Sequence, residues 1–192
     1  MRNTTVQGSD TRARAGPDLL APVTRADHRR GARRPTITIV EYGDFASQAC
    51  RAAEPGVRMV LAAHPETAEL VFRHFPVEFA HPLALMAAEA TEAAAAQGKF
   101  WEMHDALLQE GASLHRAALD QVAEALGLDM ALFKSSLDSE IYRQRIREQQ
   151  DGGIRSHLRA GPEFFVNGKV CDVSGGMHEL ANTVAAADVV AP

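Results

Sequence analysis

The order of strand-like and helix-like segments is the feature that most limits how this chain can fold. Residues 36–42 are β-branched and apolar, and residues 69–75 carry an apolar run, so both segments are typical of buried strands. A helix is expected between them, beginning near Ser47 as a possible cap and ending at about residue 64. Two parallel strands joined by a helix form a right-handed βαβ unit.

A long helical block follows this unit before any further strand signal appears. Residues 81–158 have a helical pattern throughout, and apolar strand segments return at 163–166 and 169–173 around Asn167-Gly168. Asn-Gly between two apolar runs is a strong signal for a two-residue hairpin, which would place Cys171 opposite Phe164. The sequence therefore predicts an α/β fold in which a helical subdomain, at about 81–158, is inserted into a sheet domain.

Charge divides the chain into an arm and a body. Residues 1–34 hold eight arginines against three aspartates, which gives this segment a net charge of +5. The remaining residues carry a net charge of −10, so the whole chain has a net charge of −5. The arm lacks periodicity, so we expect a disordered basic N-terminal tail at 1–34 and a single domain at 35–190. No aromatic residue is interleaved with these arginines, and stacking on bases has no support, so no nucleic-acid partner is predicted.

The cysteine count and the apolar runs set the remaining limits. The two cysteines, Cys50 and Cys171, cannot make a disulfide scaffold or a four-thiolate zinc site, and no metal is expected. A Cys50–Cys171 disulfide is not expected either, because the two should lie on opposite sides of the sheet. The sequence has no run of 18 apolar residues, so no membrane span is predicted, and the expected location is the cytoplasm.

Four separated segments together resemble DsbA-like thioredoxin domains, of the type found alone and fused behind sodium/proton antiporters. They are residues 40–45 (VEYGDF), 72–76 (FRHFP), 81–105 (beginning HP and ending GKFWEMHD) and 161–168 (GPEFFVNG). They occur in the family's order, and the resemblance covers about residues 20–190. It implies a thioredoxin fold with an inserted helical subdomain.

The resemblance places Ser47 and Cys50 where the family has the two cysteines of Cys-x-x-Cys. In the family the first thiol lies at a helix N-terminus, where the helix dipole favours the thiolate that attacks a substrate disulfide. Serine cannot perform this exchange, because the reaction needs sulfur, so the dithiol cycle is excluded. Cys50 occupies a position that is largely buried in the family. It is therefore either a structural thiol or a single reactive thiol.

Other parts of the family's site are also implied. Glu41, six residues before Ser47, matches a buried carboxylate below the thiol pair, and burial should raise its pKa. Gly161 and Pro162 match the cis-proline loop, whose exposed backbone pairs with an extended peptide or glutathione. The family more often has Thr or Val at the position of Gly161, so we expect a wider groove.

Aromatic residues near these positions are candidates for lining the groove: Tyr42, Phe45 and Phe79. Packing in the core is the alternative for each of them.

Three hypotheses for the function remain. The first is a thiol-disulfide oxidoreductase-family protein with Ser47-x-x-Cys50, acting weakly or through one thiol on protein or peptide thiols and disulfides. The second is a non-catalytic module whose proline groove binds a peptide. The third is a kappa-type enzyme in which Ser47 stabilises a bound glutathione thiolate, although Gln48-Ala49 does not match the Ser-Pro-Tyr motif of that class. Glutathione is the one small molecule implied; no other cofactor is expected, and the oligomeric state is left open.

Overall fold

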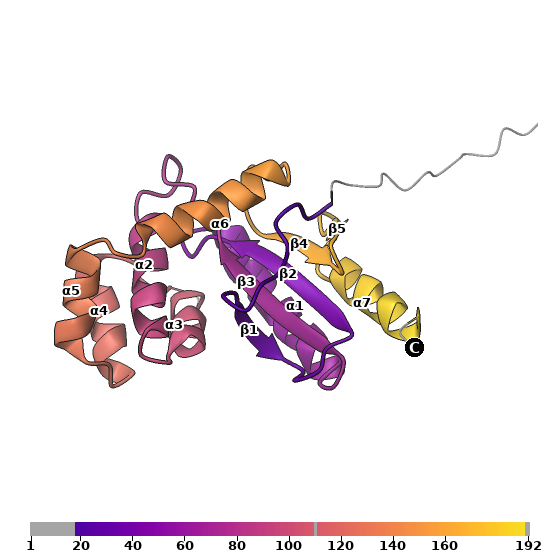
Figure 1. Ribbon diagram of the computed structural model, residues 1–192, viewed down its shortest axis with the longest axis horizontal. Coiled ribbons are helices and arrows are strands. Elements are labelled where there is room, and N and C mark those ends of the chain that lie inside the picture. The colour runs from indigo at the N-terminus through magenta and orange to yellow at the C-terminus, as the bar shows by residue number, and fades with distance from the viewer. Residues whose placement is uncertain (1–17, 110, 191–192) are drawn as a thin grey trace, which may run out of the picture.

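A five-stranded mixed sheet forms the centre of the molecule (Figure 1). The computed structural model describes residues 18–109 and 111–190. The strand order is β1-β3-β2-β4-β5, and the strands span His28–Gly31 (β1), Ile37–Gly43 (β2), Ala68–His74 (β3), Glu163–Val166 (β4) and Lys169–Cys171 (β5). β2 and β3 are parallel, and the other neighbouring pairs are antiparallel. The predicted βαβ unit is therefore confirmed.

Helices cover both faces of this sheet. On one face, α1 (Gln48–Ala63) and α7 (His178–Val190) pack on apolar residues of β2, β3 and β4, and the two helices contact each other. On the other face, α6 (Arg143–Arg155) and the N-terminal segment cover a second cluster that includes Val40, Phe75 and Phe165. Both faces are buried, which explains why β2 and β3 read as continuous apolar runs rather than as alternating patterns.

The helical block lies between β3 and β4 in the chain and beside the sheet in space (Figure 1). It begins with α2 (Ala84–Ala95) and α3 (Phe100–Leu107) and continues through α4 (Arg116–Ala125) and α5 (Met130–Asp138) into α6. Its core is built from apolar side chains of α2 to α5 and extends to Phe45 and Phe72 of the sheet domain. The α/β fold with an inserted helical subdomain, as predicted, is confirmed.

The two local predictions nearest the site are also confirmed. α1 begins directly after Ser47, whose side chain accepts a hydrogen bond from the backbone N–H of Cys50. Asn167 and Gly168, with φ of 49° and 81°, form the two-residue turn between β4 and β5. Positive φ at both positions is what this hairpin turn requires, and it sets Cys171 opposite Phe164.

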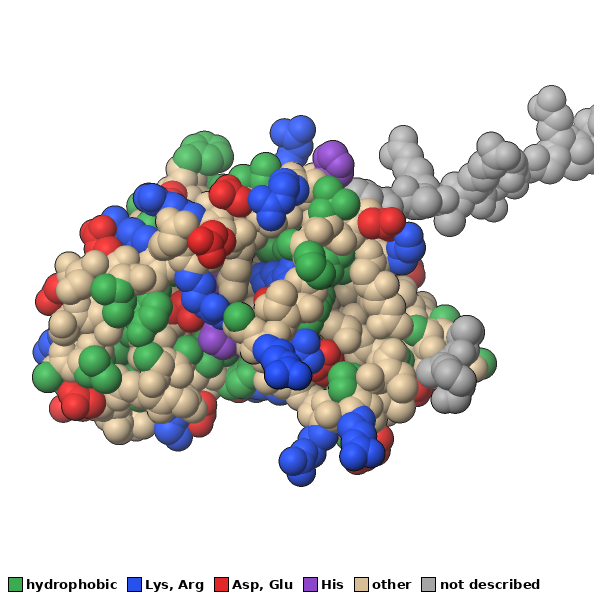
Figure 2. Space-filling view, in the orientation of Figure 1, with side chains coloured by type: hydrophobic (Ala, Val, Ile, Leu, Met, Phe, Trp, Pro, Cys, Tyr) green, Lys and Arg blue, Asp and Glu red, His purple; other side chains and the backbone are tan. Residues whose placement is uncertain are grey.

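The predicted tail at residues 1–34 is wrong at its C-terminal end. His28–Gly31 forms β1, an edge strand paired antiparallel with β3, while residues 1–17 lie outside the described residues. Two arginines of this strand pair with acidic side chains of the body, Arg29 with Glu69 and Arg30 with Asp105. Figure 2 shows Lys and Arg side chains gathered over this edge of the sheet. The basic segment is thus partly neutralised within the fold.

Candidate active site

Ser47 is built into the start of α1 rather than presented to solvent. It is the N-cap residue in an extended conformation, with φ −76° and ψ 125°, and is 7% exposed. Its oxygen accepts from the Cys50 N–H at 3.4 Å, and its hydroxyl donates to the Gly161 carbonyl oxygen at 3.5 Å. Ser47 therefore links the helix start to the loop that carries Pro162.

Cys50 lies directly beneath Ser47 and is 1% exposed. Its sulfur accepts a hydrogen bond from the Asp44 N–H at 3.4 Å. Burial raises the pKa of the Cys50 thiol to about 12, and the nearby negative charge of Glu41 contributes to this rise. A thiol with this pKa holds very little thiolate at neutral pH, so Cys50 is a weak nucleophile in this conformation.

Glu41 lies on β2 and is 0% exposed. None of the residues that the structure describes gives a hydrogen bond to either of its carboxylate oxygens. Burial raises its pKa to about 8, and the negative charge of Glu54 on α1 adds to the effect. The pKa of Glu41 is raised by burial, as expected from the sequence, and Glu41 is therefore mostly protonated at pH 7.

The Gly161–Pro162 peptide bond is cis, and this loop closes over the sulfur. A Cβ atom at Gly161 would lie 2.5 Å from the Tyr42 carbonyl oxygen and 3.3 Å from the Cys50 sulfur. Position 161 therefore faces inward, and the expectation that glycine widens the groove is wrong. Glycine instead lets the loop approach β2 and Cys50 closely.

Two of the three aromatic residues expected to line the groove are buried in the core instead. Tyr42 and Phe45 are fully buried, so the prediction that they line a binding groove is wrong. Tyr42 packs against Phe75 and Phe165 and accepts a hydrogen bond from Arg73, and Phe45 belongs to the core shared with the helical block. Their positions on a doubly covered strand and on the turn after it explain this burial. Phe79, in contrast, is 95% exposed.

Two grooves flank the Ser47–Cys50 turn. The first, here called the proline groove, has a volume of about 420 Å³ and is lined by Ala49, Pro162, Glu163 and Met177 among others. The second, here called the arginine groove, has a volume of about 550 Å³. It runs along α1 and reaches the end of α3, with Gln48, Arg51, Pro55, Arg58 and Leu108 in its wall. Sequence reasoning missed the arginine groove, although two arginines seven residues apart on one helix were a usable signal.

Asp44 is another part of the site that was not predicted from the sequence. Its buried carboxylate accepts hydrogen bonds from the backbone N–H groups of Ala46 and Val77, at 2.8 and 3.0 Å. It also contacts the His81 ring nitrogen Nδ1 at 2.8 Å. Asp44 thereby ties the turn before α1 to the loop after β3, and so it fixes the position of the site relative to the helical block.

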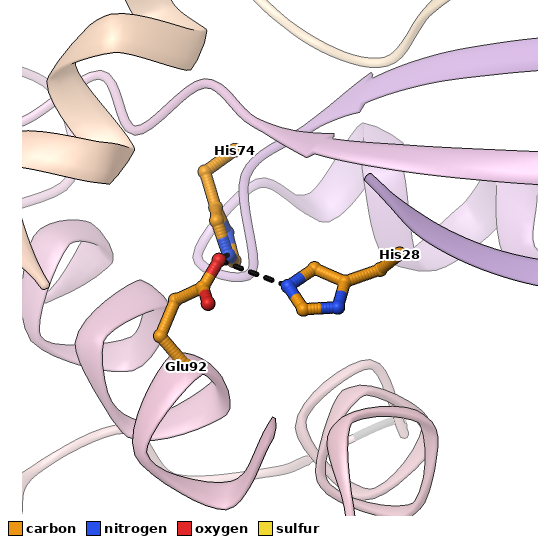
Figure 3. A group of neighbouring side chains, drawn as sticks. All are labelled: His28, His74 and Glu92. Carbon is orange, nitrogen blue, oxygen red and sulfur yellow. Dashed lines mark hydrogen bonds and ion pairs between the residues drawn. The ribbon is translucent and has the colours of Figure 1, made fainter. Parts of the chain in front are cut away.

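The structure brings together His28, His74 and Glu92 from β1, β3 and α2 (Figure 3). Both imidazole Nε2 atoms lie close to Glu92 Oε1, at 3.0 and 3.1 Å, and Arg145 donates to the same oxygen at 2.8 Å. Burial alone would raise the pKa of Glu92, but the hydrogen bonds from the two histidines lower it well below its usual range. Because Arg145 already supplies a cation, this group is an ionic junction between elements.

A second titratable group joins α1 to α3. Glu54, His104 and Asp105 place one ligand-type atom each within 4.8 Å of one another. Glu54 pairs with Arg58 at 2.7 Å, and Asp105 pairs with Arg30 at 2.9 Å. Guanidinium groups therefore balance both carboxylates, as they do in the first group, and sequence spacing gave no sign of either cluster.

Comparison with known proteins agrees with this architecture. The model of a family described as Thioredoxin matches residues 24–186. Among solved structures, a thioredoxin-like oxidoreductase from Silicibacter pomeroyi superimposes with a TM-score of 0.75 at 23% identity, covering 85% of this chain and 92% of that one. BdbD from Bacillus subtilis gives a TM-score of 0.74 at 19% identity over 90% and 96% of the two chains. The expected thioredoxin fold of the DsbA-like type is confirmed.

Similar sequences occur within larger transport proteins. The Na(+)/H(+) antiporter NhaA 1 of Salinispora arenicola is 43% identical over 88% of this chain and 26% of its own length. NhaA 3 of Salinispora tropica is 44% identical over 79% of this chain and 23% of its own length. The chain thus spans about a quarter of these relatives. Within residues 18–109 and 111–190, no helix has both the length and the apolar character needed to cross a bilayer.

Proposed function

This chain belongs to the thioredoxin family, and from that premise we propose that it is a thiol-disulfide exchange domain reduced to one slow thiol, Cys50. Ser47 replaces the sulfur that would attack first, while the rest of the site keeps its arrangement around the second sulfur. The observation that carries the proposal is the position of the Cys50 sulfur, beneath Ser47 and against the Gly161–Pro162 loop.

The chemistry at this site is a single exchange step. The Cys50 thiol gives its proton to a base, and the resulting thiolate attacks a substrate disulfide. A Cys50–substrate mixed disulfide forms as the substrate S–S bond breaks, and the other half leaves as a thiolate. With no thiol at position 47, an external thiol such as glutathione or a protein cysteine must break the mixed disulfide and return Cys50 to its reduced form.

We assign the base for this step to Glu41, whose charge is close enough to raise the pKa of the Cys50 thiol. Both residues are among those that the structure describes, and no hydrogen bond joins their side chains, so the proton crosses through a water molecule. Above a pH of about 8 the Glu41 carboxylate is ionised and able to take this proton. At pH 7 it is mostly protonated, so the first step is slow. The proline groove, with Ala49 and Pro162 in its wall, gives an extended substrate a surface beside the sulfur.

The kappa-type alternative has less support. Its serine hydroxyl must donate to a bound glutathione thiolate, but the Ser47 hydroxyl donates to the Gly161 carbonyl oxygen. Cys50 is buried, and if its thiol never reacts in the native state, the non-catalytic function is the correct one. A measurement of Cys50 reactivity therefore separates the two remaining functions.

The test is mixed-disulfide formation with oxidised glutathione, followed by intact-protein mass. A Cys171→Ser variant leaves Cys50 as the one thiol, and a Cys50→Ala, Cys171→Ser double variant is the blank. We expect a single glutathione adduct that forms faster at pH 9 than at pH 7, because ionised Glu41 and the thiolate form of Cys50 both increase over this range. Absence of any adduct at pH 9 from native protein, with rapid reaction in urea, would assign the non-catalytic function instead.

A further inference from the structure

The arginine groove is a surface that the proposed exchange step does not use. It starts at Gln48, the residue after Ser47, so it begins at the Ser47–Cys50 turn and lies across α1 from the proline groove. Ala52 lines both grooves and forms the ridge between them. A substrate that reaches Cys50 can therefore extend into either groove.

We propose that the arginine groove binds an acidic, extended segment of the substrate polypeptide, with Arg51 as the residue that selects for negative charge. The proposal rests on the proposed function for its placement beside Cys50. It adds the substrate class, which is a protein or peptide with carboxylates close to its reactive sulfur.

The spacing along α1 fits an extended chain. Gln48, Arg51, Pro55 and Arg58 follow each other by three or four residues, so they form one stripe along the helix. The stripe spans eleven residues, and the ten rises between its ends measure about 15 Å of helix axis. An extended peptide rises about 3.3 Å per residue, so roughly four or five residues fit along it. The groove has an apolar wall formed by Ala52, Pro55 and Leu108, which the side chains of the bound peptide would contact.

The two guanidinium groups differ in how they are held. Arg58 is engaged at 2.7 Å by the carboxylate of Glu54, which also lines the groove and neutralises much of the Arg58 charge. Arg51 instead donates through NH1 to the Phe45 carbonyl oxygen at 2.9 Å. That bond fixes the guanidinium without neutralising it and leaves most of its N–H donors for another acceptor. A carboxylate is the acceptor that matches a positioned guanidinium best.

The experiment measures equilibrium binding of cysteine-free peptides to the full chain by fluorescence anisotropy. One labelled peptide carries alternating Asp and Ser, and a second carries Lys in place of Asp. Because neither contains sulfur, the result does not depend on whether Cys50 reacts. Arg51→Gln is the test variant, and Lys134→Gln, an exposed cation on α5, is the charge-matched control.

We expect the acidic peptide to bind and the basic peptide not to bind. Arg51→Gln should weaken the binding of the acidic peptide about tenfold, the size of one charge-assisted bond, and Lys134→Gln should leave it unchanged. Circular dichroism checks that each variant is folded, and Arg51→Lys should restore part of the affinity. Equal binding of both peptides, or no effect of Arg51→Gln, overturns the proposal. Binding of glutathione through Arg51 without any binding of the acidic peptide also overturns it. Loss of Cys50 reactivity alone would instead refute the proposed function.

Discussion

At the scale of single residues, Ser47 caps the start of α1 but supplies no sulfur for disulfide exchange. Serine is among the best residues for capping a helix N-terminus, so α1 keeps its start and its position. Its hydroxyl does not ionise in the physiological range and performs no sulfur exchange. In the proposed function, the helix start is kept while the sulfur of the first step is missing, and Cys50 acts as the one exchanging thiol.

Glu41 makes stability depend on pH in a direction that can be tested. Its pKa is about 8 in the folded protein and close to the ordinary 4.5 when unfolded, so the unfolded state loses its proton first. The contribution of Glu41 to stability is fully present below pH 4.5 and is lost as the pH rises to about 8. The loss is on the order of 5 kcal/mol.

A Glu41→Gln variant removes this dependence, because its amide does not titrate. We expect the variant to gain stability relative to the parent between pH 5 and 8, with a constant difference above about pH 8.5. Urea unfolding of both proteins across this range measures the difference. Parallel pH curves for the two proteins would show that Glu41 does not titrate as described.

Gly161 is required by close approach to the backbone. A Cβ atom at this position would meet the Tyr42 carbonyl oxygen at 2.5 Å, and the backbone of β2 cannot move aside without disturbing the sheet. We expect Gly161→Ala to cost about 1–3 kcal/mol of the free energy of unfolding. Gly175→Ala is the matched control, since its Cβ would meet only Glu179 at an ordinary 3.5 Å. Equal stability of the two variants in urea would refute this account of Gly161.

At the scale of elements, β1 is held by charge more than by apolar burial. It pairs with β3, and His28 also stacks on Phe100 of α3 with ring centroids 3.6 Å apart. The buried Glu92 carboxylate is the common acceptor that joins β1, β3, α2 and α6 (Figure 3). Removing its charge should therefore loosen the contact between the edge strand and the helical block.

A Glu92→Gln variant tests this junction. We expect a loss of about 3 kcal/mol, because a buried ionic network loses the charge that balances Arg145. Amide hydrogen exchange in β1 should also accelerate. Glu102→Gln removes an exposed carboxylate paired with Lys99 and should change stability by less than about 1 kcal/mol. Unchanged β1 exchange in Glu92→Gln would contradict the role given to the junction.

Structural elements could be predicted from the sequence where neighbouring residues determine them. The cap at Ser47 and the Asn167-Gly168 turn depend on neighbouring residues, and both appear as expected. β1 was not predictable, because His-Arg-Arg-Gly has no apolar alternation and its pairing depends on β3, forty residues away in the chain. Tyr42 and Phe45 were misplaced for a related reason, since the covering of both sheet faces is decided by distant helices.

At the scale of the molecule, the helical block and the sheet meet at the start of α1, where Asp44 fixes the turn and the two grooves open. The fold class followed from the order of segments, whereas the arginine groove depends on how α3 packs beside α1. A similar sequence makes up about a quarter of the length of the antiporter relatives. In the proposed function, two positions of this site, Ser47 and Cys50, decide which chemistry the domain performs.

The most direct test of this claim is insulin reduction by a Ser47→Cys, Cys171→Ser variant, with dithiothreitol as the reductant. Ser47→Cys, Cys50→Ala, Cys171→Ser is the control that lacks the second thiol. We predict disulfide reductase turnover in the first variant and none above background in the Cys171→Ser parent or the control. A folded Ser47→Cys variant that stays at background would contradict the claim that position 47 alone interrupts the dithiol cycle.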